Sequence, residues 1–92
     1  MLGEFKNIPK KIRDSLDEEQ KDERIDIMVI LNLNLALCHL KRDKASDAIK
    51  HCKDAIELNP KECKAYYRLA QAYKMNNDLD QAKDAFTESI KL

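Results

Sequence analysis

The sequence predicts an all-α fold built of antiparallel helix pairs, and three observations support this class. The 92 residues include a single Gly and two Pro, whereas helix-forming Ala, Leu, Lys, Glu and Gln are abundant. Apolar residues recur every three or four positions through most of the chain, as they do on one face of a helix. Finally, sliding the sequence against itself until Leu35 meets Leu69 superimposes many similar side chains, which indicates an internal repeat.

Length, charge and cysteine content narrow the classes of function. Hydrophobic residues make up 43% and charged residues 37% of the chain, enough for one small domain with a thin core. Seventeen basic residues balance seventeen acidic ones, so no net field favours nucleic acid or an anionic membrane. The longest apolar run, residues 27–40, is interrupted by Asn32 and Asn34 and is shorter than the roughly 20 residues of a membrane span. Three cysteines without a C-x-x-C pair, and no signal-peptide pattern, predict reduced thiols in the cytoplasm.

The first third of the chain gives the weakest helical signal. Its apolar positions step by three and four: Phe5, Ile8, Ile12 and Leu16. Because proline is tolerated only in the first turn, a helix in this region should begin near Pro9. Residues 14–26 are densely charged, which indicates either a solvated turn or an exposed helix extension.

Four helical segments are expected, over residues 20–41, 45–58, 60–75 and 78–92. Residues 31–35 alternate apolar and polar like a strand, but helical spacing continues on both sides and no turn residue bounds the five, so helix is favoured. Asn59 is expected to be the N-cap of the third segment, with Pro60 in its first position. Residues 76–78 should close the third segment and cap the fourth.

The internal repeat superimposes small residues on small ones and large on large. Its clearest pairs are Leu35 with Leu69, Ala36 with Ala70, Ala48 with Ala82, and Ile56 with Ile90. Small residues recur where two helices must approach closely, and larger residues recur where the pair fills its core.

This period and pattern resemble the tetratricopeptide-repeat (TPR) family, in which one repeat is about 34 residues long. The resemblance implies helix-turn-helix repeats stacked as a right-handed superhelix. It assigns residues 29–62 and 63–92 to two repeats, and residues 1–28 to the remnant of a preceding repeat with an extended helix. His39, Cys52 and Asn32 depart from the family pattern, which more often has larger or aromatic residues there.

In this family the first helix of each repeat lines the concave face of the superhelix. That face would present Asn34 from one repeat and Lys64 and Arg68 from the next, with both cations on one side of a helix because they stand four residues apart. The remaining groove-lining residues would be Ile30, Leu33, Leu37, Lys41, Tyr67, Gln71 and Met75. Two cations and an amide suit a carboxylate-rich peptide end, since charged hydrogen bonds to carboxylates are the stronger ones.

The trio is similar to the carboxylate clamp of TPR co-chaperones. In that family the clamp binds the C-terminal EEVD tail of the 90-kDa or 70-kDa heat-shock chaperones, and Asn34, Lys64 and Arg68 match three of its positions. A Lys and an Asn that the family takes from a preceding repeat have no match here. The apolar run of residues 30–41 after a charged helix also resembles the TPR regions of immunophilins of the FKBP and large cyclophilin types. The chain itself is therefore expected to lack enzyme activity, although a parent chain could carry a peptidyl-prolyl isomerase domain.

Plainer interpretations stand beside the clamp. Lys64 and Arg68 could simply form a solvated face, but an Asn among leucines costs free energy unless it finds a partner. His39 beside Cys38 does not suggest a metal site, because neighbours in a helix point about 100° apart. No metal and no cofactor are expected.

Two function classes remain open. The first is a binding module for chaperone tails, and the second is a TPR scaffold or self-association module without tail binding. The second is favoured by an incomplete first repeat and by uncapped ends, which should expose apolar side chains and could produce a homo-oligomer. The expected exposed residues are Ile25, Met28 and Leu31 at one end, and Leu79, Phe86 and Ile90 at the other.

Overall fold

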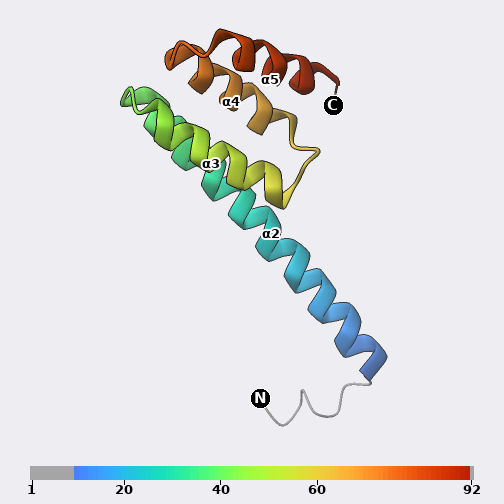
Figure 1. The fold of residues 1–92 in the computed structure, drawn as a ribbon. Helices are drawn as coiled ribbons and strands as arrows, with labels where there is room; N and C mark the ends of the chain where they lie inside the picture. The colour runs from blue at the N-terminus through green and yellow to red at the C-terminus, as the bar shows by residue number, and fades with distance from the viewer. Residues whose placement is uncertain (1–9, 92) are drawn as a thin grey trace.

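A computed structural model describes the backbone of residues 10–91 and the side chains of residues 20–91. It contains the helices α2 (Lys10–Lys41), α3 (Ala45–Leu58), α4 (Cys63–Met75) and α5 (Leu79–Lys91). The helices form two pairs, α2 with α3 and α4 with α5, and the second pair stacks on the first mainly through α3 and α4 (Figure 1). No strand occurs within residues 10–91, and the predicted all-α class is confirmed.

Helix α2 is much longer than its partner α3 and projects beyond the two pairs (Figure 1). The charged stretch of residues 14–26 is part of it, so that stretch is a helix extension and not a turn. The alternating residues 31–35 also lie in α2, which confirms the choice of helix over strand. The apolar positions from Phe5 to Leu16 lie outside the residues whose side chains the structure describes. None of the described helices is both long and apolar enough to cross a membrane.

Both helix pairs turn in the same way. Asp43 and Asn77, which occupy equivalent positions in the two repeats, adopt the left-handed conformation, with φ of 58° and 62°. The next residue in each turn donates its backbone N–H to a carbonyl five residues earlier, Lys44 to His39 at 2.8 Å and Asp78 to Tyr73 at 2.8 Å. This is the Schellman arrangement, which satisfies carbonyls left over at a helix end. The backbone of the turn therefore repeats with the same period as the sequence.

The connection between the two pairs differs from its prediction. Asn59 is the C-cap of α3 and not the N-cap of α4, since α4 begins only at Cys63. The Asn59 side-chain Oδ1 accepts a hydrogen bond from the backbone N–H of Lys61 at 3.1 Å. An Asn side chain can serve either a helix start or such a turn, and here it forms the turn.

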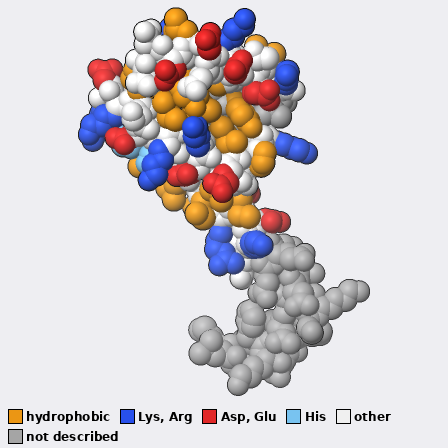
Figure 2. Space-filling view, in the orientation of Figure 1, with side chains coloured by type: hydrophobic (Ala, Val, Ile, Leu, Met, Phe, Trp, Pro, Cys, Tyr) orange, Lys and Arg blue, Asp and Glu red, His pale blue; other side chains and the backbone are white. Residues whose placement is uncertain are grey.

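Small side chains make up most of the core. Ala36, Cys52 and Ala70 are fully buried in one cluster, together with Leu69 and Ala85. Because Ala36, Cys52 and Ala70 are small, α2, α3 and α4 can approach closely. Burial also raises the pKa of the Cys52 thiol to about 11, although the nearby Arg68 charge opposes this. Several larger apolar side chains instead reach the surface, where hydrophobic and charged groups lie side by side (Figure 2).

Two of the residues that depart from the family pattern, His39 and Asn32, each contact His51. The rings of His39 and His51 stack with centroids 5.2 Å apart. His51 Nδ1 lies 3.1 Å from Asn32 Oδ1, and Asn32 Nδ2 donates to the Met28 carbonyl. These contacts join α2 to α3, so His39, the largest of the departures from the family pattern, packs within the helix pair.

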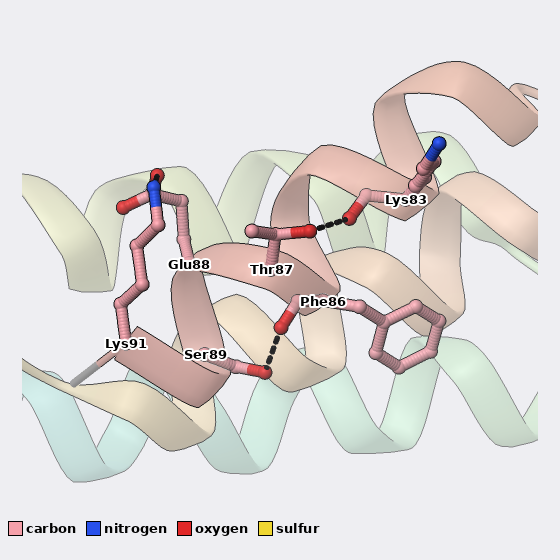
Figure 3. Close-up of polar contacts among 6 residues, drawn as sticks. All are labelled: Lys83, Phe86, Thr87, Glu88, Ser89 and Lys91. Atoms are coloured by element: carbon pink, nitrogen blue, oxygen red, sulfur yellow. Dashed lines mark hydrogen bonds and ion pairs between the residues drawn. The ribbon is translucent and has the colours of Figure 1, made fainter.

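Helix α5 satisfies two of its hydroxyl groups internally (Figure 3). Thr87 Oγ1 donates to the Lys83 carbonyl at 2.9 Å, and Ser89 Oγ donates to the Phe86 carbonyl at 2.7 Å. At the C-terminal end of this helix, Lys91 and Glu88 form an exposed ion pair of 3.6 Å, which contributes little stability because both groups are solvated.

Candidate functional site

Arg68 links the two repeats. It is half-buried on α4, and its Nη1 donates a hydrogen bond of 2.8 Å to the backbone carbonyl of Leu33 on α2. The guanidinium therefore lies at the junction of the two first helices. Its charge is also felt at Cys52 on α3, so three helices meet around this side chain.

The other two residues of the predicted trio lie beside this junction. Asn34 immediately follows Leu33 on α2, and its side chain is exposed. Lys64 is exposed one turn before Arg68 on α4. The hydrogen bond of Arg68 thus brings its α4 turn next to the α2 turn that carries Asn34. Two cations and an amide occupy adjoining turns of two contacting helices.

The predicted groove-lining residues differ in exposure. Ile30 and Lys41 are exposed on α2, Leu37 is half-buried, and Tyr67, Gln71 and Met75 are exposed on α4. Leu33 is buried instead, in a cluster with Val29, Ala55 and Ala65. The Leu33 side chain is therefore unavailable to a ligand, and its contribution to this region is the carbonyl that Arg68 contacts.

An open cavity of about 460 Å³ lies along the outer part of this region. Its lining residues are Tyr67, Gln71, Lys74, Met75 and Phe86. The Tyr67 and Phe86 rings meet edge to face with centroids 5.6 Å apart, so α5 supplies part of the wall. Asn34, Lys64 and Arg68 are not among the lining residues.

Sequence reasoning did not assign Lys74 and Phe86 to this region. Lys74 stands seven residues after Tyr67, two turns along the same helix, and that spacing could have indicated it. Phe86 could not be assigned from spacing alone, because its contact with Tyr67 depends on how α5 packs against α4. Within residues 20–91, no three His, Cys, Asp or Glu side chains are grouped so as to hold a metal ion.

Comparison with known proteins identifies the class. Two family models, each described as a tetratricopeptide repeat, match residues 30–62 and 51–84. Together they cover more than half of the chain, and they agree with the repeated turn and the two stacked pairs. The chain belongs to the tetratricopeptide-repeat family.

Particular relatives share this region. The chain is 33% identical over 78 residues to the peptidyl-prolyl cis-trans isomerase FKBP4 of Bos taurus, covering 85% of the chain and 17% of that protein. It is 34% identical over 83 residues to the Hsp70/Hsp90 co-chaperone CNS1 of Saccharomyces cerevisiae, covering 90% of the chain and 21% of that protein. It is 32% identical over all 92 residues to the peptidyl-prolyl cis-trans isomerase PASTICCINO1 of Arabidopsis thaliana, of which it covers 14%. The chain thus spans about a fifth or less of the length of these relatives.

Proposed function

We propose that this chain is a protein-binding module for the acidic C-terminal tail of a 70-kDa or 90-kDa heat-shock chaperone. The single observation that carries the proposal is the placement of Arg68, which lies between α2 and α4 with Lys64 and Asn34 on adjoining turns. The yeast relative is named an Hsp70/Hsp90 co-chaperone, which supports the same class of partner. A cytoplasmic location and one repeat each in residues 29–62 and 63–92 complete the proposal.

The chemistry of the trio fits a terminal carboxylate. Arg68 presents a planar fork of N–H donors, of which one bonds to Leu33, while others can donate to a carboxylate. Lys64 adds a compact positive charge, and the Asn34 amide can donate to a second oxygen or to the peptide backbone. The exposed apolar surface of Ile30 and Tyr67 is available for an apolar side chain of the tail.

Titration with a peptide that ends in EEVD, with the same peptide amidated at its C-terminus as control, tests the proposal. Lys64→Ala and Arg68→Ala should each weaken binding by about 1.5–3 kcal/mol, or roughly ten- to a hundredfold, the scale of a hydrogen bond to a charged group. Lys50→Ala removes an exposed lysine from α3, outside the trio, and should leave the affinity unchanged. Because Arg68→Ala also removes the contact with Leu33, its circular dichroism must be recorded alongside.

Salt gives an independent readout. Exposed charges are screened with a Debye length of about 8 Å at physiological ionic strength, so binding of the carboxylate peptide should decline as salt is added. The proposal fails if the amidated peptide binds as well as the free acid, or if both alanine variants bind like the unmodified chain.

A scaffold or self-association role is the alternative, and the exposed apolar residues of α2 and α5 favour it. Under that alternative the chain would ignore both peptides and still associate. The isomerase names of two relatives do not extend to this chain, for which we propose no enzyme activity of its own.

A further inference from the structure

The two repeats bury equivalent positions to very different extents on α2 and α4. Leu69 of α4 packs into the core with 7% exposure, but Leu35, its equivalent on α2, is 44% exposed. Ala65 is fully buried, whereas its equivalent Leu31 is 55% exposed. On α4 these positions face α3; on α2 they form an apolar stripe that no described helix covers. We name this stripe the α2 face, formed by Met28, Leu31, Leu35 and Cys38.

The opposite mismatch occurs on α5. Ile56 of α3 packs against two core clusters, but its equivalent Ile90 is 84% exposed. Ala45 is buried, while its equivalent Leu79 is 60% exposed. We name the second stripe the α5 face, formed by Leu79, Phe86 and Ile90, which line one open groove of about 410 Å³ together with Lys74 and Lys83. Of the residues expected at the two ends, Ile25 and Phe86 are half-buried instead of exposed, because each packs against a core cluster.

These two faces are the two sides of one interface that the chain already contains. Within the chain, Ile56 and Ala65 belong to one packed cluster, and Cys52 and Leu69 to another, where α3 meets α4. Shifting each member of these pairs by one repeat gives Ile90 against Leu31 and Phe86 against Leu35. One member of each new pair lies on the α5 face and the other on the α2 face.

We propose that the α5 face of one copy stacks on the α2 face of a second copy, repeating between chains the α3–α4 packing found within the chain. The occupant of each exposed face is thus another copy of this chain, bound head to tail. Such contact is heterologous, so each added copy leaves one face of each kind uncovered. Assembly is therefore open-ended and grows with concentration, instead of stopping at a symmetric dimer.

The contact between copies should be weak. Leu31 and Phe86 are larger than Ala65 and Cys52, their equivalents inside the chain, so the helix axes must stand further apart than α3 and α4 do. Each copy contributes only one helix to the contact. The area buried per partner should therefore be smaller than the roughly 800 Å² of a stable interface. We expect a dissociation constant of about 0.1–1 mM for the contact between copies.

Sedimentation velocity on the full chain, from about 10 μM to 1 mM, tests the proposal with one variant on each face. Leu35→Lys and Ile90→Lys place a positive charge on the α2 face and the α5 face. Each should weaken self-association about tenfold or more, because the added charge would be buried near Lys74 and Lys83 without an acidic partner. Ser46→Lys, at an exposed α3 position outside both faces, should associate like the unmodified chain.

Mixing the two variants distinguishes head-to-tail stacking from other arrangements. Leu35→Lys retains an intact α5 face and Ile90→Lys an intact α2 face, so a mixture should form 1:1 dimers that grow no further. A symmetric dimer through α2 would be lost in Leu35→Lys, untouched in Ile90→Lys and not restored by mixing, and this result would overturn the proposal. A chain that stays monomeric at 1 mM would overturn the proposal as well. Peptide titration of Ile90→Lys reports separately on tail binding, because Ile90 lies on α5, whereas Asn34, Lys64 and Arg68 lie on α2 and α4.

Discussion

Equivalent leucines in the two repeats should differ sharply in their contribution to stability. Leu69 lies in the core cluster, and Leu35, its equivalent one repeat earlier, is only partly covered. Replacing either by alanine removes the same three carbon atoms from the same kind of helix position. The two substitutions are therefore a matched pair that differs in burial alone.

The magnitudes follow from that difference. Each buried methylene-sized group is worth about 0.8 kcal/mol, so the transfer contribution of three such groups at Leu69 is about 2 kcal/mol. A cavity between α3, α4 and α5 adds to this, which brings Leu69→Ala to about 3 kcal/mol. At Leu35 little more than half of the residue is covered and solvent can fill the space, so Leu35→Ala should cost about 1 kcal/mol or less.

Urea unfolding followed by far-ultraviolet circular dichroism measures both losses. The protein concentration should stay near 10 μM, where stacking between copies does not contribute. For a chain of this size total stability is only about 5–10 kcal/mol, so Leu69→Ala should visibly lower the midpoint. Equal losses from the two substitutions, or a larger loss from Leu35→Ala, would refute the assignment of the core.

Three further predictions concern the turns and the thiols. Asp43→Gly and Asn77→Gly should each raise the unfolding free energy in urea by about 0.5–1 kcal/mol, because glycine adopts positive φ without the steric cost; no gain at either site would contradict the turn geometry. The buried Cys52 thiol is neutral in the folded protein, and its contribution to stability is fully present below pH 9.0, the ordinary pKa of this thiol. That contribution is lost as the pH rises toward the folded-state pKa of about 11. The loss should reach about 2 kcal/mol by pH 10.5, and a Cys52→Ala chain with an equal loss would exclude this cause. Ellman's reagent should label the exposed Cys38 and Cys63 in the folded protein and Cys52 only after unfolding.

Much of the fold could be predicted because the same sequence pattern occurs in both repeats. Asn77 was expected to end a helix, and Asp43 in the equivalent position makes the same turn. Asn59 was assigned the wrong role, because the same side chain can cap a following helix or close a turn after the preceding one, and only the backbone decides. The charged stretch before residue 27 left helix and turn open, since an exposed helix has no apolar stripe to identify it.

The candidate site was harder to predict in detail. Periodicity assigns Asn34 and Arg68 to equivalent positions on their own helices, but it does not predict contacts between the helices. The contact of Arg68 with the Leu33 carbonyl depends on the angle and offset between α2 and α4. The same packing turns the Leu33 side chain inward, and the spacing of residues along α2 does not contain that information.

The hydrogen bond between Arg68 and Leu33 has a consequence for the thermodynamics of recognition. An unrestrained arginine side chain loses up to about 2 kcal/mol of rotamer entropy when a ligand fixes it. In this protein the guanidinium is already held across α2 and α4 before any ligand arrives, so much of that loss occurs during folding. An anion that binds Arg68 meets a donor group of fixed direction, and less entropy is lost on binding. The same hydrogen bond couples the packing of the two repeats to the orientation of the guanidinium. Loosening the packing between α2 and α4 should therefore lower ligand affinity without removing any charge.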